Sequence, residues 1–200
     1  MAGAIFEWAT PWFVREARRW TPQDARAIAS RLSVALTDGG NVLDVGGGTG
    51  QLAGLLARAA SCEVTVLDAS AAMLRHASGT PGVAPVLGDA SAMPFHDAAS
   101  DAVIALDALH HMSRQSDIAR EMARVLRPGG IVFVAEPDPR ARAVRLSRLL
   151  ERMLGEPGSM LTPEAIVELF CGAGVIGETE RQNEMGYVFV GRTGGLSADR

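Results

Sequence analysis

The sequence predicts an α/β fold in which a doubly wound, mostly parallel sheet carries helices on both faces. Short, uninterrupted apolar runs, the pattern of strands buried on both faces, alternate with longer helical patterns along the 200 residues. A glycine-rich turn at residues 46–50 (GGGTG) separates the first such run from the first helical pattern, and an RPGG turn at residues 127–130 follows a later helical pattern. This repetition of strand, helix and strand implies right-handed crossovers between parallel neighbours.

The expected elements follow in chain order. Two helix starts are expected where a threonine precedes a proline, at Thr10-Pro11 and Thr21-Pro22, and Asp24 completes a capping box in the second. The expected strands of the core cover residues 42–45, 63–67, 84–87, 102–106 and 131–135. The expected helices between them cover residues 51–60, 71–76 and 116–126, and the RPGG turn is expected to form a tight connection into the last strand.

The remaining elements follow Pro139. An amphipathic stretch continues to Leu154, and Thr162-Pro163-Glu164 opens a last helix to about residue 171. Runs at 177–182 and 186–191 predict a closing antiparallel strand pair. We therefore expect a single domain with four parts: a helical cap (1–40), the core (41–138), further helices and closing strands (139–192) and a frayed tail (193–200).

Composition restricts the possible partners. Apolar residues make up 48% of the chain and charged residues 21%, as in ordinary globular domains. The formal net charge of −4 does not favour a nucleic-acid partner. Cys62 and Cys171 form no CxxC pair, and no His, Cys and carboxylate cluster has metal-ligand spacing, so no metal is predicted. Since no apolar run approaches the roughly 18 residues of a membrane span and no signal-peptide pattern is present, we expect a cytoplasmic location.

The glycine-rich turn is the first chemical signal. A dinucleotide fingerprint, Gly-x-Gly-x-x-Gly, would need glycine where Gln51 or Ala53 stands, so a dehydrogenase is excluded by spacing. What remains is an acid followed by three glycines at alternate positions, with Gly47 at a variable position between them: Asp44, Gly46, Gly48 and Gly50. This pattern resembles the first motif of the class I methyltransferases that use S-adenosylmethionine.

Further motifs of the same family follow in the correct order between residues 41 and 138. They are VTVLDASAAML around Asp68, Gly88-Asp89-Ala90, DAVIALDALHHM, and REMARVLRPGGIVFVAEPD. Together they resemble the small-molecule branch of the family, which includes the quinone-biosynthesis C-methyltransferases. The resemblance implies a Rossmann-like fold, S-adenosyl-L-methionine as cofactor and a small-molecule methyl acceptor.

The resemblance also implies roles for individual residues. Asp44 is expected to hold the cationic amino-acid end of the cofactor, Asp68 to accept the two ribose hydroxyls, and Asp89 to meet the adenine amino group. Ala90 is expected beside the adenine through its backbone, and Ala69, with Met93, as an apolar wall. Simpler roles stay open for the three acids: Asp44 as a partner of the glycine turn, Asp68 as a helix N-cap and Asp89 as an ordinary loop residue.

Methyl transfer requires a general base only if the acceptor arrives protonated. The candidates lie after the fourth expected strand: His111 first, then His110, and Asp107. Imidazole has a suitable pKa for this role, although two adjacent histidines cannot both face one cavity, and positioning without a base is the alternative. The aromatic residues near the N-terminus are expected either to close over an apolar acceptor or to pack on the sheet: Phe6, Trp8, Trp12 and Phe13.

The sequence thus predicts a methyltransferase that acts on a small molecule by in-line transfer. The first alternative is a domain that keeps the fold but only binds the cofactor or supports a partner. A methyltransferase acting on RNA or protein is disfavoured by the acidic charge. It is also disfavoured because Asp107-Ala108-Leu109-His110 stands where amino-methylating enzymes often carry Asn/Asp-Pro-Pro-aromatic.

Overall fold

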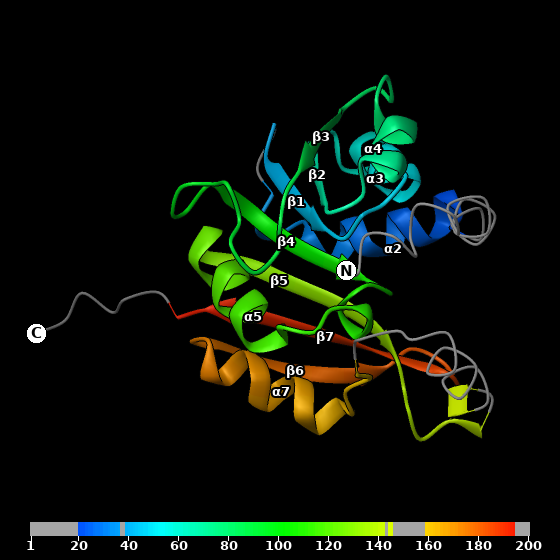
Figure 1. Ribbon diagram of the computed structural model, residues 1–200, viewed down its shortest axis with the longest axis vertical. Helices are drawn as coiled ribbons and strands as arrows, with labels where there is room; N and C mark the ends of the chain where they lie inside the picture. Colours follow the sequence, from blue (N-terminus) through cyan, green and yellow to red (C-terminus); the bar gives the residue numbers. More distant parts are fainter. Residues whose placement is uncertain (1–19, 37–38, 143, 146–158, 195–200) are drawn as a thin grey trace, which may run out of the picture.

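The computed structural model describes residues 20–36, 39–142, 144–145 and 159–194. Figure 1 shows a central twisted sheet with helices on both of its faces. Several expectations lie outside the described residues, namely the helix start at Thr10-Pro11, the N-terminal aromatic residues, most of the amphipathic stretch after Pro139, and most of the tail.

One sheet of seven strands forms the centre of the molecule, in the order β3-β2-β1-β4-β5-β7-β6. The strands are β1 (Asn41–Val45), β2 (Glu63–Asp68), β3 (Val83–Leu87), β4 (Ser100–Leu106), β5 (Leu126–Pro137), β6 (Val175–Arg181) and β7 (Gly186–Thr193). The first five strands are parallel to one another, whereas β7 pairs antiparallel with both β5 and β6. The predicted doubly wound sheet and its closing antiparallel pair are confirmed.

Helices cover the two faces of this sheet. They are α2 (Pro22–Leu32), α3 (Gln51–Ala60), α4 (Ala71–Ala77), α5 (Gln115–Val125) and α7 (Pro163–Gly172), with a short 3₁₀ turn, η1 (Leu109–His111). In Figure 1, α2, α3 and α4 lie on one side of the sheet and α5 and α7 on the other. The predicted capping box begins α2: Thr21 accepts from the Asp24 N–H at 3.3 Å, and Asp24 accepts from the Thr21 N–H at 2.8 Å.

The core is divided by the sheet, because successive side chains of a strand point to opposite faces. In β4, Ala102 and Ile104 pack toward α2 and α3, whereas Val103 and Ala105 pack toward α5 and α7. Both clusters are almost entirely apolar and buried, which explains why the strands appear in the sequence as uninterrupted apolar runs.

One expected connection is different in the structure. The RPGG turn was predicted to join a helix to a separate strand beginning at residue 131, but β5 begins directly at Leu126. The register with β4 shifts between Ser100 and Ala102, so the glycines form an irregularity within the strand. Gly129 has φ +77°, and a Cβ on Gly130 would lie 2.7 Å from the Asp101 carbonyl oxygen, so glycine is required at both positions.

The closing strand pair gives a test of its packing. A Cβ on Gly177 of β6 would clash with the backbone of Val190 and Gly191 in β7. Gly177→Ala should therefore lower the free energy of unfolding by about 1–3 kcal/mol, measured by urea denaturation.

The matched control is Gly172→Ala, at the last residue of α7, where an added Cβ would meet nothing within 4 Å. This change should leave stability equal or slightly higher, because alanine favours helix. An equal free energy of unfolding for Gly177→Ala and the control would contradict the close approach of β6 and β7 at Gly177.

Candidate functional site

The predicted site residues converge on the carboxyl edge of the parallel strands. Asp44 lies near the end of β1, Asp68 ends β2, and Asp107 directly follows β4. Parallel pairing brings these strand ends to the same edge of the sheet, which is where open α/β sheets bind ligands. Asp89, two residues after the end of β3, is at the same edge.

The glycine turn between β1 and α3 has a backbone that only glycine adopts easily. Gly46, Gly48 and Gly50 have φ values of +74°, +55° and +68°. Packing adds a second requirement at two of them: a Cβ on Gly46 would lie 2.7 Å from Met112 Cε, and one on Gly50 would lie 2.8 Å from Ala77 Cβ. At Gly48 the nearest protein atoms would be at ordinary contact distances, so the protein itself does not crowd that position.

Asp44 is the most unusual group at this edge. Its side chain is buried, with 3% of the residue exposed, and no residue in the described part of the chain donates a hydrogen bond to its carboxylate. Burial, with the charge of Asp68 as a second cause, raises the pKa of Asp44 to about 7. The prediction that Asp44 merely bonds the glycine turn is therefore not supported, and the site has an acid that a bound cation would stabilise.

Gly47, which the sequence pattern treats as variable, is needed because of Asp44. A Cβ at Gly47 would clash with the Asp44 carboxylate. Direct contact between the glycine turn and the buried acid therefore requires a fourth glycine. The only signal in the sequence is the uninterrupted Gly46-Gly47-Gly48 run.

Asp68 connects the end of β2 to the glycine turn. Its two carboxylate oxygens accept from the Gly48 N–H at 2.9 Å and the Ser70 N–H at 2.8 Å. Burial raises the pKa of Asp68, although these hydrogen bonds act in the opposite direction. The N-cap of α4 is Ser70, which accepts from the Met73 N–H at 3.3 Å, so the helix-cap alternative for Asp68 is wrong. Each carboxylate oxygen retains acceptor capacity for a further donor.

The segment after β3 carries Asp89, which is exposed to solvent. One of its oxygens accepts from the Ser91 N–H at 2.8 Å and the Ser91 hydroxyl at 2.7 Å, and these bonds hold the pKa of Asp89 below its ordinary value. Asp89 thus stabilises its own loop, and its second oxygen has no part in these bonds. Ala90 is half-buried, Met93 is buried in the core, and Ala69 is exposed beside Asp68.

The histidines lie on the 3₁₀ turn after β4. His110 is buried, and its Nδ1 lies 2.6 Å from Glu136 Oε2 at the end of β5. The other Glu136 oxygen accepts from the Leu109 N–H at 2.9 Å and the Ala108 N–H at 3.2 Å. A carboxylate can only accept, so toward an ionised Glu136 the Nδ1 nitrogen is the one that donates.

His111, the first candidate base, is half-buried, and its ring centroid lies 3.9 Å from that of His110. Asp107 is a non-glycine residue with φ +54°, and its N–H donates to the Ala135 carbonyl at 2.8 Å. Glu136 is a residue of this group that the sequence alone does not single out. The register between β4 and β5 pairs Leu106 with Ala135, so an acid one residue later in β5 could have been expected beside the residues that follow β4.

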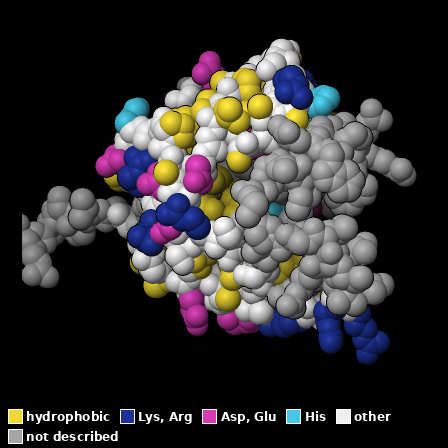
Figure 2. All heavy atoms as spheres, viewed as in Figure 1, with side chains coloured by type: hydrophobic (Ala, Val, Ile, Leu, Met, Phe, Trp, Pro, Cys, Tyr) yellow, Lys and Arg dark blue, Asp and Glu magenta, His cyan; other side chains and the backbone are white. Residues whose placement is uncertain are grey.

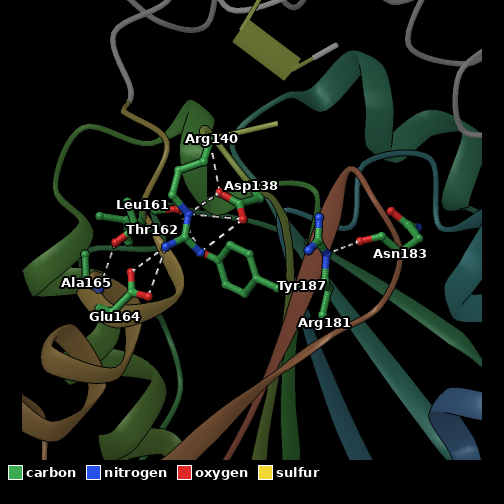
Figure 3. Close-up of polar contacts among 9 residues, drawn as sticks. All are labelled: Asp138, Arg140, Leu161, Thr162, Glu164, Ala165, Arg181, Asn183 and Tyr187. Carbon is green, nitrogen blue, oxygen red and sulfur yellow. Dashed lines mark hydrogen bonds and ion pairs between the residues drawn. The ribbon is translucent and has the colours of Figure 1, made fainter. Parts of the chain in front are cut away.

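Beyond β5, a group of polar contacts fixes the edge of the site (Figure 3). The guanidinium of Arg140 donates to Asp138 at 3.0 Å and to Glu164 of α7 at 3.1 Å. The Tyr187 hydroxyl donates to the Leu161 carbonyl at 2.9 Å, and burial, with the charges of Glu136 and Asp138, raises the pKa of Tyr187. Arg140 is thus already paired with two carboxylates, so we assign it a structural role.

In the part of the chain that the structure describes, no group of three or more His, Cys, Asp or Glu residues could hold a metal ion. The described helices are also all too short or too polar to cross a membrane.

Comparison with known proteins identifies the family. Residues 43–134 match a family described as "Methyltransferase domain". The matched region is a class I S-adenosylmethionine-dependent methyltransferase domain. This confirms the resemblance of the motifs, and S-adenosylmethionine is the cofactor of the family.

Several relatives are named as methyltransferases. The chain is 40% identical over 111 residues to the ubiquinone/menaquinone biosynthesis C-methyltransferase of Paracoccus denitrificans, covering 52% of this chain and 44% of that protein. It is 31% identical over 137 residues to the O-methyltransferase resE of Aspergillus sclerotiorum, covering 62% and 51%. It is 34% identical over 127 residues to the 27-O-demethylrifamycin SV methyltransferase of Amycolatopsis mediterranei, covering 58% and 47%. The matches therefore span about half the length of these relatives.

Solved structures share the fold. A chain from a Haloferax volcanii complex between the Trm112 methyltransferase activator and a protein described as a methyltransferase matches with a TM-score of 0.80 at 20% identity, covering 100% of both chains. The [4+2]-cyclase SpnF matches with a TM-score of 0.75 at 22% identity, covering 96% of this chain and 95% of that one. At such identities the likeness concerns the fold alone.

The residues at the carboxyl edge fit the cofactor of the family. Its α-ammonium and sulfonium groups carry positive charge, and Asp44 is a buried acid that lacks a donor among the described residues. A Cβ at Gly48 would meet protein atoms only at ordinary contact distances, and the backbone of this turn is held by Asp68. The arrangement has the negative charge that a sulfonium with an ammonium group requires.

The pKa of Asp44 gives a test based on pH. If the carboxylate must ionise to hold a cation, the Kd for S-adenosylmethionine should rise about tenfold per pH unit below pH 7, because one proton is then linked to binding. Asp44→Asn should weaken binding at pH 8 and flatten this pH dependence. Calorimetry between pH 6 and pH 8 measures both effects.

The same substitution should stabilise the ligand-free protein. The pKa of Asp44 is about 7 in the fold against an ordinary 3.8, so this group lowers stability as pH rises from about 4 to about 7. Asp44→Asn should raise Tm at pH 8, and the gain should shrink toward pH 5. An unchanged Tm at pH 8, together with an unchanged Kd, would contradict the buried-acid account.

Proposed function

We propose that this protein transfers the methyl group of S-adenosylmethionine to a small-molecule acceptor. The observation that carries the proposal is the buried Asp44 carboxylate without a described donor, next to a glycine turn that the protein does not crowd at Gly48. The relatives named for ubiquinone/menaquinone biosynthesis and for 27-O-demethylrifamycin SV support the acceptor class.

Three acids are assigned to the cofactor. Asp44 binds its cationic amino-acid end, directly or through water, because a buried carboxylate gains most from a positive partner. Asp68 accepts the ribose hydroxyls with the acceptor capacity left after Gly48 and Ser70 are bonded. Asp89 receives the adenine amino group on the oxygen that Ser91 does not use.

His110 is assigned as the general base, with Glu136 as its positioning residue. Glu136 fixes the His110 ring and the tautomer, so that Nε2 is the nitrogen with a free lone pair. The same carboxylate stabilises the imidazolium that forms when a proton is taken up. His111 and Asp107 are assigned to shaping the turn beside it.

The bound cofactor supplies a methyl group on a sulfonium, already activated for transfer. His110 Nε2 would take up the proton that an acceptor hydroxyl, or an activated carbon, loses when it is methylated. The protein's task is to align the two partners and accept one proton.

A silent cofactor-binding or partner-supporting domain is the second candidate. Its support is that the fold also serves a [4+2]-cyclase, and that a structural neighbour was solved in a complex with a methyltransferase activator. A nucleic-acid substrate is not favoured, since the net charge is −4 and Figure 2 shows acidic and basic side chains next to one another on the face bearing α5. Methyl transfer to any acceptor in a panel of phenols, quinols and amines separates the two candidates.

Cofactor binding is tested first. S-adenosylhomocysteine should bind the wild-type protein with micromolar affinity, and Asp68→Ala should weaken this binding by about 1–3 kcal/mol, the value of hydrogen bonds to a charged group. Glu180→Ala, which removes an exposed partner of Arg31 at the far edge of the sheet, is the matched control and should bind normally. No binding by the wild-type protein at millimolar ligand would exclude the proposed function.

The general base is tested by turnover. His110→Gln should reduce kcat about 10²-fold or more while the cofactor Kd stays within twofold, because the base acts in the chemical step. Glu136→Gln should also reduce kcat and change the pH profile, since an amide can donate to Nδ1 and select the other tautomer. His111→Gln is the control, and a larger loss there than at His110 would reverse the assignment.

A further inference from the structure

The loop between β3 and β4 is held from outside the site by two residues of α5. Glu121 Oε2 accepts from the Met93 N–H at 2.7 Å, in the middle of the segment that follows Asp89. Arg124, one turn further along α5, donates to Glu121 at 2.7 and 2.8 Å. Glu121 and Arg124 therefore hold the loop from helix α5, outside the site.

Arg124 binds the loop at three further points. It donates to the Met93 carbonyl at 3.2 Å, to the Phe95 carbonyl at 2.8 Å and to the Asp97 carboxylate at 2.7 Å. Its own carbonyl accepts from the Ala98 N–H at 3.0 Å. A planar guanidinium carries five N–H donors in a fixed arrangement, so it can hold several acceptors at once.

The position of this clamp connects it to Asp89. Met93 is buried in the same core cluster as Leu67, which precedes Asp68 in β2, so the loop is anchored by packing as well as by hydrogen bonds. Between Asp89 and Met93 are only three residues, and Ala92 N–H donates to the Asp89 carbonyl at 3.0 Å. A displacement of the Met93 backbone would therefore also move Asp89.

We propose that Glu121 and Arg124 are positioning residues that hold Asp89 in place for the adenine ring. The inference rests on the proposed function, because it takes Asp89 as the partner of the adenine amino group. Neither residue lines the site: both act through the backbone of residues 93–98. The sequence signal is a Glu and an Arg three positions apart on α5, which would otherwise be read as an ordinary helix ion pair.

The test compares two ligands that differ at one group. S-adenosylhomocysteine and its 6-deamino analogue, with purine in place of adenine, are titrated into wild-type protein and into Arg124→Gln. In the wild type the analogue should bind about tenfold or more weakly, the scale for a lost hydrogen bond to a carboxylate. In Arg124→Gln the ratio of the two Kd values should fall toward 1.

Two further variants complete the design. Arg120→Gln is the matched control, because Arg120 lies one turn earlier on α5 and its contacts among the described residues are with Asp117 and the Ser116 carbonyl. Its Kd ratio should equal that of the wild type. Glu121→Gln keeps an acceptor for the Met93 N–H but loses the ion pair, so it should lower the ratio in the same direction, and it replaces Arg124→Gln if that variant does not fold.

Hydrogen exchange gives a second readout without ligand. The Met93 amide should exchange at least tenfold faster in Arg124→Gln than in Arg120→Gln. If both Kd values rise together and their ratio stays at the wild-type value, the clamp is merely structural and the inference is wrong. A wild-type ratio near 1 also overturns it, whereas failure of wild-type protein to bind S-adenosylhomocysteine at all overturns the proposed function itself.

Discussion

The buried carboxylate of Asp44 is the constraint on which the carboxyl edge of the sheet depends. It lies beneath Gly47 with its pKa raised to about 7, and no described residue donates to it. A protein rarely retains such a group unless a ligand compensates it, since burial of an unpaired charge lowers stability. The absence of a Cβ at Gly47 follows from keeping this acid directly against the glycine turn.

Three other acids at this edge, together with Glu121 of α5, share a different role. Asp68 accepts from the Gly48 and Ser70 amides, Asp89 from Ser91, Glu136 from Ala108 and Leu109, and Glu121 from Met93. Each of these carboxylates therefore fixes backbone that follows a strand, and Asp68 does so after both β1 and β2. Charge-assisted hydrogen bonds to amides are strong, and they leave acceptor capacity for a ligand. The loops are held by acids, and Asp44 alone among these acids has no amide to hold.

The fold could be predicted from the sequence because the strands are buried on both faces. Val42–Val45 and Ala102–Leu106 consist of aliphatic residues apart from Asp44, and the helices between them have clear caps and periods, as at Thr21 and Asp24. The predicted start of β5 was wrong. A Pro-Gly-Gly sequence normally ends an element, but here the pairing of Leu126 with Ser100 continues the strand through it.

The residues of the candidate site could be predicted only where they lie together in one sequence motif. Asp44, Asp68 and the glycines stand next to strand ends, so the sequence places them. Glu136 and Glu121 act on residues about 26 to 28 positions away, and this distance is visible only once β4, β5 and α5 are packed together. The choice between His110 and His111 also depends on Glu136, because the two rings are adjacent and equal in the sequence.

The most direct measurement is a crystal structure of the protein with S-adenosylmethionine. The account predicts that the ammonium nitrogen of the ligand lies about 3 Å from an Asp44 oxygen, or is joined to it by one water. It is contradicted if the ligand occupies the edge of the sheet with its amino-acid end directed away from β1, or if Asp44 is satisfied by a donor of the protein.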